Sequence, residues 1–265
     1  MTANANYQDI YNEAEQYLLS FDPVEQHLLD RHLNAWNDNE PTDLFELYHG
    51  LLKAAKTKRG MPNSIGEIQR LDHLLHGFSP QEVVDAYDSW KDFFHTLEQD
   101  DYDPPGPLDV DNPRSYWVQF SKSIISGARF LSRFDGIQEF NEFTGKFTTS
   151  EYTRFSLPLL LREQIHGLGF ALGCEFLKEN GYPRFVKPDV HLKEIFFGLD
   201  ISDADTDFEV FVDIIRFAEK IEELPYRVDK LFWLVGSGRF YLESPEQTIM
   251  TDKQDFIERV QAIMK

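Results

Sequence analysis

Apolar residues recur at intervals of three and four along most of the chain, and this spacing marks one face of an α-helix. Tyr7, Tyr11, Ala14 and Leu18 show the pattern near the start. The same spacing predicts two helices within residues 3–36, broken at Asp22-Pro23, and further helices over 43–55, 79–97, 113–134, 208–221, 226–234 and 252–264. We therefore predict an all-α protein.

Residues 156–192 contain the densest local signals. Ser156 suits a helix N-cap, and Pro158 suits the first turn of that helix. Residues 166–169 (HGLG) interrupt the helix with two glycines, and a second helix then runs to a plausible C-terminal cap at 180–181. An irregular segment with two prolines follows and ends at Asp189.

Three interpretations compete for the glycines of residues 167–173. A dinucleotide-binding fingerprint needs a buried strand before it, whereas the preceding segment is charged and helical, so we reject it. A helix-hairpin-helix would expose backbone N–H groups at the start of its second helix, where a phosphate oxygen binds favourably. An ordinary αα-corner with a glycine turn remains an open alternative.

The pattern LP-LL-EQ-IHGLG-ALGCEFL…KPDVHL resembles the helix-hairpin-helix (HhH-GPD) superfamily of DNA base-excision glycosylases. That family has a Gly-apolar-Gly hairpin, a small residue one turn later and an Asp at the start of the next helix. Gly167, Gly169, Gly173 and Asp189 match these places. The resemblance is clearest over residues 157–199 and extends more weakly to residues 43–87.

The resemblance implies a two-lobed helical fold with a cleft between the lobes and with Asp189 as the catalytic residue. Family members that also nick the strand carry a Lys in the first turn of the second hairpin helix, and residues 170–172 (FAL) contain none. The implied enzyme is therefore monofunctional and leaves an abasic site. Lys178 and Lys187 lie nearby in sequence, so an unusual lysine arrangement remains open.

Several residues are candidate DNA contacts. Residues 56–63 form a predicted exposed loop in which Met61 would fill the hole left by an extruded base, although a plain connector between helices explains the loop nearly as well. His191 is either a phosphate contact or a packing residue. The hairpin carbonyls of the family can also hold a monovalent cation. The predicted DNA-binding set is Gly167, Leu168, Gly169, Lys187, His191, Lys56, Lys58, Arg59 and Asn63.

Tyr116 and Trp117 are weak candidates for the wall of a base pocket, because aromatic rings stack on bases. Aromatic residues at helical spacing are more often core, and we favour that interpretation. The single Cys, Cys174, excludes an intramolecular disulfide and a Cys-ligated iron–sulfur cluster. Residues 200–207 fail the calcium-loop pattern, so we expect no metal and no other cofactor.

The formal net charge of −20 counts against a nucleic-acid partner, because phosphate contacts supply most non-specific affinity for DNA. The acidic residues concentrate in 98–111 and 200–207. Basic residues gather at 53–59, at Arg184 and Lys187, and at Lys122, Arg129 and Arg133. We predict a basic groove on an acidic body; scattered solvated charges are the alternative. The Asp- and Pro-rich segment 98–112 is the predicted lobe boundary within one domain over residues 1–265.

The first residues lack a secretory signal, and no apolar run approaches the ~20 residues that span a bilayer. We expect a cytoplasmic monomer, nucleoid-associated if bacterial, with no membrane partner. Its expected partner is double-stranded DNA with a damaged or modified base, and a bulky modification of viral DNA is one hypothesis. The alternatives are a non-catalytic helix-hairpin-helix DNA-binding module and an acidic all-α interaction protein without a DNA partner.

Overall fold

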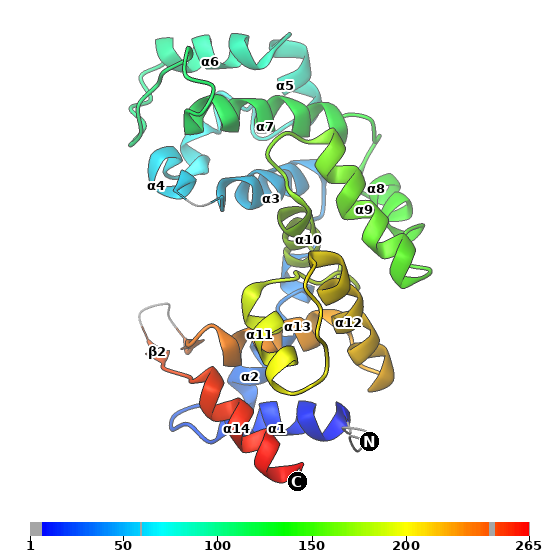
Figure 1. Cartoon of the computed structure of the whole chain (residues 1–265). Coiled ribbons are helices and arrows are strands. Elements are labelled where there is room, and N and C mark those ends of the chain that lie inside the picture. Colours follow the sequence, from blue (N-terminus) through cyan, green and yellow to red (C-terminus); the bar gives the residue numbers. More distant parts are fainter. Residues whose placement is uncertain (1–6, 59, 244–246, 265) are drawn as a thin grey trace. The chain divides into compact units, whose positions relative to one another are not determined.

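The computed structural model describes residues 7–58, 60–243 and 247–264, and over these residues the chain is mostly helical with almost no strand (Figure 1). They form fourteen α-helices, two short 3-10 helices at Asn37–Asn39 and Ile68–Leu71, and one two-residue antiparallel strand pair. The predicted all-α class is confirmed. No helix in this part of the chain is long and apolar enough to cross a membrane.

The chain divides into two compact units, each with its own core. Unit 2 is the continuous segment Glu40–Asn180, and unit 1 combines the chain up to Asn39 with the chain from Gly181 onward. The predicted boundary at residues 98–112 therefore lies inside unit 2. Tyr102 in that segment is buried and donates its hydroxyl to the Ile65 carbonyl at 2.8 Å, and the Gly106 amide donates to the Ser64 carbonyl at 2.9 Å. These bonds fasten the acidic loop to its own unit.

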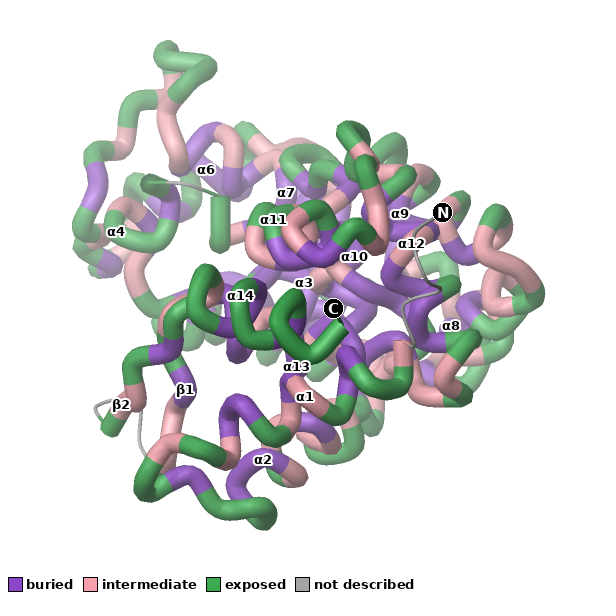
Figure 2. Tube along the Cα trace, turned by 60° about the horizontal axis from the view of Figure 1, so that its bottom comes forward, coloured by how far each residue is buried: buried purple, intermediate pink, exposed green. Residues whose placement is uncertain are grey.

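Unit 2 is built around α7 (Tyr116–Leu131), most of whose residues are buried. Figure 2 marks the buried residues of the chain in purple. Neighbouring helices pack against α7 from several sides. The other helices of the unit are α3 (Leu44–Lys56), α4 (Met61–Ile65), α5 (Pro80–Ala86), α6 (Trp90–Gln99), α8 (Ile137–Gly145), α9 (Glu151–Gln164) and α10 (Phe170–Glu179).

Unit 1 is arranged in the same way around α13 (Pro225–Gly236), which contacts five other helices of that unit. Phe232 of α13 makes edge-to-face ring contacts with Phe196 and Phe217 in its core. The other elements are α1 (Tyr7–Leu19), α2 (Gln26–Leu33), α11 (Val190–Gly198), α12 (Asp207–Lys220), β1 (Phe240–Tyr241), β2 (Thr248–Ile249) and α14 (Lys253–Ile263).

Two helix predictions differ from the structure because a local cap overrides the apolar period. The helix predicted over 79–97 is two helices: Tyr87 is extended, and the Ser89 side chain accepts from the Asp92 amide to start α6. The helix predicted to begin at Ser156 begins one to two turns earlier, where Ser150 and Thr153 form a capping box. Pro158 consequently lies inside α9, and Ser156 is an exposed position within it.

The corrected start of α9 gives a test of stability. Ser150→Ala should lower the free energy of unfolding by about 1 kcal/mol, because it removes the side-chain acceptor of a helix N-cap. Ser156→Ala is the matched control and should change stability by less than about 0.5 kcal/mol, because Ala suits an exposed helix interior. Urea unfolding followed by circular dichroism measures both, and the reverse order of effects would restore the start at Ser156.

Candidate functional site

The glycine turn between α9 and α10 has the conformation of a tight helical hairpin. Gly167 has φ +79°, in the left-handed region that favours glycine, and Leu168 is buried beneath the turn. Gly169 is the N-cap of α10 with φ −64°, and its amide donates to the Gly167 carbonyl at 3.2 Å. The predicted arrangement of two helices joined at residues 166–169 is confirmed.

The start of α10 carries no side-chain cap. The first N–H groups of a helix have no intrahelical acceptor, and they bind anions well because the helix dipole points the same way. Glycine at the N-cap leaves these groups uncovered, and Gly169 is exposed. The turn is therefore suited to hold a phosphate oxygen through backbone N–H groups.

Three polar side chains on one face of α7 hold the hairpin in place. Ser123 Oγ donates to the His166 carbonyl at 2.7 Å, and Ser126 Oγ accepts from the His166 amide at 2.9 Å. Gln119 Oε1 and His166 Nε2 are 2.9 Å apart. Sequence reasoning missed this anchor, although polar residues spaced by four and three in an apolar helix were a visible signal of it.

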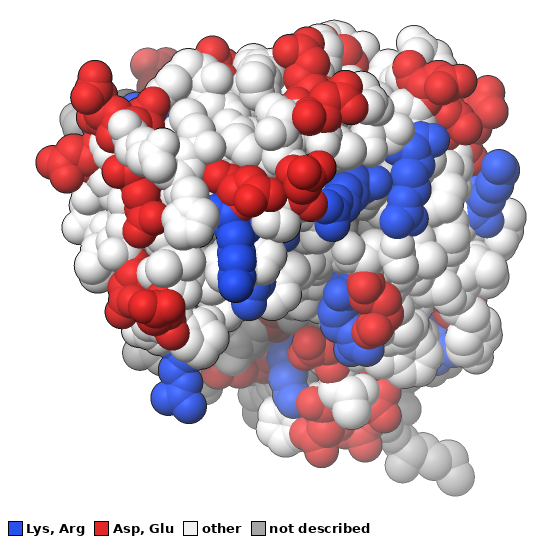
Figure 3. All heavy atoms as spheres, turned by 90° about the horizontal axis from the view of Figure 1, so that it is seen from above, with Lys and Arg blue, Asp and Glu red and all other residues white. Residues whose placement is uncertain are grey.

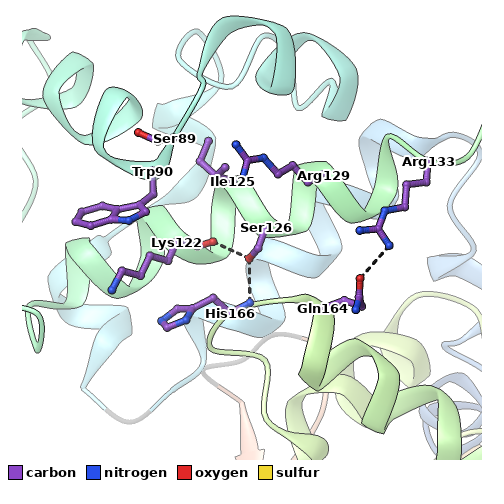
Figure 4. A pocket seen from close by; sticks show the side chains of 9 residues that line it. All are labelled: Ser89, Trp90, Lys122, Ile125, Ser126, Arg129, Arg133, Gln164 and His166. Atoms are coloured by element: carbon purple, nitrogen blue, oxygen red, sulfur yellow. Dashed lines mark hydrogen bonds between the residues drawn. The ribbon is translucent and has the colours of Figure 1, made fainter.

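A pocket of about 340 Å³ opens beside this anchor, entirely within unit 2 (Figure 4). Its walls include Lys122 and Arg129 of α7, Arg133 in the turn after that helix, Trp90 of α6, and Gln164 and His166 of the hairpin. No Asp or Glu lines it. Lys122, Arg129 and Arg133, which we predicted to lie in the middle helix, all line this pocket, but α7 ends at Leu131 and Arg133 lies in the turn after it.

The surroundings of His166 lower the pKa of its imidazole. Burial lowers the pKa of its imidazole, and the positive charges of Lys122 and Lys58 lower it further. The ring is therefore mainly neutral at pH 7 in the free protein. An anion placed beside it would act in the opposite direction and raise this pKa.

Asp189 lies in unit 1 and is the N-cap of α11. Its Oδ1 accepts hydrogen bonds from the His191 amide at 2.8 Å and the Leu192 amide at 3.3 Å. Oδ2 makes no hydrogen bond to any residue that the structure describes, and the side chain is half-buried. One oxygen thus fixes the carboxylate, and the other makes no hydrogen bond to the described residues.

The loop that carries Asp189 is braced against α13. The buried carboxylate of Asp229 accepts from the Lys187 amide at 2.6 Å, and the Tyr226 amide donates to the Pro183 carbonyl at 2.9 Å. Phe185 and Val186 are fully buried between these two points. The backbone leading to Asp189 is therefore held by hydrogen bonds and by packing.

The predicted contacts next to Asp189 have different surroundings. His191 packs closely on α13, since a Cβ added at Gly236 would lie 2.8 Å from the His191 Cβ. Its Nδ1 is buried without a hydrogen bond among the described residues. Packing is thus the role that the structure gives His191. The Lys187 side chain is half-buried.

The segment 56–63 differs from the predicted exposed loop. Met61 is only 2% exposed and opens the short helix α4, so it is not the exposed wedge that we predicted. Lys56 Nζ donates to the Gly66 carbonyl at 2.8 Å, whereas Lys58 and Asn63 are exposed. Arg59 lies outside the described residues.

Trp117 is fully buried and belongs to the core of unit 2, the alternative that we favoured over a base-stacking role. Its Nε1 donates to the Ser64 carbonyl at 3.1 Å, and its ring packs edge-on against Tyr102. Tyr116 is half-buried and packs on the turn at Gly60, where an added Cβ would lie 2.3 Å from its hydroxyl. Cys174 is buried, as expected of an unreactive thiol.

Acidic and basic side chains are interspersed on the face drawn in Figure 3. The basic character of the pocket is therefore local, on a chain whose formal net charge is −20. Local charge of this kind acts over about 8 Å at physiological salt.

The hairpin carbonyls of Ile165, His166 and Gly167 each already accept a hydrogen bond. A monovalent cation bound to these hairpin carbonyls stays a prediction.

Comparison of the chain with protein-family models, with curated proteins and with solved structures found no match.

The two hairpin glycines should respond differently to substitution. Gly167→Ala should lower the free energy of unfolding by about 2 kcal/mol, because it forces a Cβ into the left-handed region and to 2.9 Å from Ser123 Oγ. Gly169→Ala should cost less than about 1 kcal/mol, because its φ is ordinary and nothing lies within 4 Å of the added Cβ. Equal losses in urea unfolding would contradict this distinction.

The titration of His166 gives a second test. Lys122→Gln should raise the pKa of His166, because it removes one of the positive charges that lower it. His49 is the internal control: burial, Lys53 and Lys56 lower its pKa, so Lys122→Gln should leave it unchanged. Ring-proton NMR shifts measured against pH report both.

The same titration has a consequence for folding. The pKa of His166 is lower in the folded chain than in the unfolded chain, so the unfolded state binds the proton first as pH falls. The free energy of unfolding should therefore decrease below about pH 6.5, the unperturbed pKa of His. His166→Gln should remove part of that decrease, and an unchanged pH profile would contradict the assignment.

Proposed function

We propose that the protein is a DNA N-glycosylase that hydrolyses the bond between a damaged or modified base and its sugar. The observation that carries the proposal is the Asp189 carboxylate, fixed through Oδ1 at the start of α11 with Oδ2 free of hydrogen bonds among the described residues. A carboxylate held in this way keeps its position while presenting one oxygen to a reacting group.

The proposed catalytic role of Asp189 follows from the bond that breaks. Cleavage of a base–sugar bond builds positive charge on the sugar, as in other glycoside cleavages. An ionised carboxylate near the sugar carbon stabilises that charge, and it also orients or deprotonates the attacking water. The brace from Asp229 to the Lys187 amide supports the proposal, because a fixed carboxylate needs no reorganisation during the reaction.

The hairpin supplies the contact with DNA in this proposal. Uncovered N–H groups at the start of α10 bind a backbone phosphate, which positions the duplex without reading its sequence. The target nucleotide must leave the base stack to reach Asp189, because a duplex hides the reacting bond. The cations around the neighbouring pocket favour the same strand electrostatically.

We propose water as the nucleophile and an abasic site as the product. The first turn of α10 is Phe170-Ala171-Leu172, so it offers no amine to attack the sugar. Lys178, at the other end of that helix, is buried and lies 3.4 Å from a Glu179 carboxylate oxygen. Neither feature supports strand nicking through a lysine.

The substrate we propose is a modified base in a specialised target, such as chemically modified viral DNA. A formal net charge of −20 disfavours tight binding to DNA in general, because phosphate contacts dominate non-specific affinity. Selectivity would then depend on the base and on a few local phosphate contacts. Base release from plain and modified viral genomes, measured side by side, tests this choice.

One observation favours a second candidate, a DNA-binding module without catalysis. Asp189 performs an ordinary structural task, because an N-cap Asp accepts backbone N–H bonds in many helices. If that task is its only one, the hairpin would bind DNA and no base would be released. The two candidates predict different behaviour of one variant.

The decisive variant is Asp189→Asn, because Asn caps a helix about as well as Asp but cannot act as an anionic base. The expected result is a loss of base release on the order of 10²- to 10⁴-fold with little change in stability. The matched control is Asp252→Asn: Asp252 caps α14 in the same unit with the same pair of backbone bonds, and its variant should keep full activity.

Base release is measured on duplexes carrying a panel of damaged and modified bases, with hot alkali to cut the abasic sites. A product that needs alkali and disappears only in Asp189→Asn supports the monofunctional glycosylase. Strand cleavage before alkali treatment contradicts the water mechanism. Binding of every duplex without release by the wild-type chain favours the binding module.

A further inference from the structure

The basic pocket of unit 2 is organised by one stripe along α7. Lys122, Ser126 and Arg129 follow one another at intervals of four and three residues, which places them on one side of α7, and Arg133 lies in the turn just after that helix. Figure 4 shows Lys122 beside Trp90 at one end of the pocket and Arg133 beside Gln164 at the other. The hairpin closes the side facing this stripe.

The three cations contact neutral groups of the described residues. Arg129 donates to the Asp88 carbonyl, Arg133 Nη1 donates to Gln164 Oε1 at 2.9 Å, and Lys122 Nζ lies 5.0 Å from the Trp90 ring centroid. None of the three makes an ion pair with a carboxylate of the described residues. The Asp92 carboxylate accepts from Ser89 Oγ at the edge of the pocket, but it is not among the lining residues.

This arrangement is unusual for an acidic chain. The sequence contains 46 Asp and Glu against 26 Lys and Arg, yet the pocket gathers three cations and excludes carboxylates. Uncompensated positive charge in a concave site is unfavourable in the empty protein, and it becomes favourable when an anion enters. The charge therefore points to an anionic ligand.

The spacing of the cations matches more than one anionic group. At 1.5 Å of rise per residue, Lys122 and Arg129 are about 10 Å apart along the axis of α7, and Arg133 follows in the turn beyond the end of that helix. A molecule with phosphates at intervals along a backbone matches cations spread in this way better than a single small anion does.

Trp90 adds an aromatic surface to this charged pocket. Its indole is half-buried, so part of the ring faces the cavity, and Lys122 lies against it. Aromatic rings combined with a positively charged groove are the pattern by which proteins hold unpaired nucleotides, with the base on the ring and the phosphates on the cations. A volume of about 340 Å³ falls within the range of small-molecule sites.

We propose that this pocket binds an unpaired nucleotide, with its base against Trp90 and its flanking phosphates on Arg129 and Arg133. The nucleotide is either part of a single strand or a free mononucleotide, since both present the same chemistry. This binding does not rest on base release by Asp189, because every residue of the pocket belongs to unit 2. An acidic peptide would use the cations but would leave Trp90 without a partner.

The test measures binding of the full-length chain to fluorescently labelled single-stranded oligothymidylate. Thymidine monophosphate, thymidine and inorganic phosphate are the competitors. Trp90→Leu and the pair Arg129→Gln with Arg133→Gln should each weaken binding on the order of tenfold. Trp90→Tyr should restore most of it, because a Tyr ring still stacks on a base.

Arg162→Gln is the matched control. Arg162 is an exposed arginine in the same unit that already pairs with Glu163 at 2.9 Å and does not line the pocket. Its loss should leave binding unchanged. A plot of log affinity against log salt concentration should become shallower by about 0.7 for each phosphate contact removed, so by about 1.4 in the double Arg variant.

The outcomes separate clearly. If thymidine monophosphate competes at least as strongly as the strand, the proposal is supported and the ligand is a free nucleotide. If it competes more weakly, the proposal is supported and the ligand is a nucleotide within a strand. If inorganic phosphate competes as well as thymidine monophosphate and the strand, and Trp90→Leu has no effect, the nucleotide proposal is overturned and the pocket is a plain anion site. Equal losses in Arg162→Gln, or no binding by the wild-type chain, also overturn it.

Failure of this proposal and failure of the glycosylase proposal are distinguishable. Asp189→Asn should bind oligothymidylate as the wild-type chain does, because Asp189 is not part of the pocket. If the chain binds the strand but releases no base, the pocket proposal stands and the glycosylase proposal fails. Circular dichroism and thermal unfolding of each variant confirm that the exposed substitutions leave the fold intact.

Discussion

The hydrogen bonds from α7 to the hairpin are the interaction on which the candidate DNA surface depends. Ser123 and Ser126 of α7 reach His166, and together they satisfy both backbone polar groups of that residue. Ser123 is buried, and a buried hydroxyl is costly when unpaired, so its bond favours one position of the turn. The same helix carries Lys122 and Arg129 of the pocket, so the hairpin and the pocket share one rigid support.

The Asp189 loop shows how one carboxylate can serve both folding and chemistry. The cap on α11 and the brace to Asp229 fix the group at little cost in stability, because each bond satisfies an amide that would otherwise lack a partner. A catalytic carboxylate needs the same fixed position. The structural task of Asp189 is therefore compatible with the proposed chemical one, and it keeps the carboxylate in place when no substrate is bound.

The charge distribution reconciles an acidic chain with an anionic ligand. Electrostatic attraction at contact distance is decided by the nearest few charges, since salt screens those beyond about 8 Å at physiological ionic strength. Lys122, Arg129 and Arg133 stand together without acidic neighbours in the pocket lining, while the many carboxylates lie elsewhere. The surrounding negative field would still weaken binding of long duplexes, which favours recognition of a small region over broad coating of DNA.

The sequence by itself determined the features that depend on neighbours along the chain. The all-α class follows from the apolar period, and the glycine hairpin and the helix beginning after Asp189 follow from local turn chemistry. Tertiary structure decided the rest, because it depends on contacts between residues distant in sequence. The acidic segment 98–112 is fastened to unit 2 by Tyr102, Met61 is buried, and Trp90 of α6 meets Lys122 of α7 to form a pocket. The spacing of the polar residues along α7 places them on one face of that helix. Only the packing of the other helices determines that this face meets the hairpin.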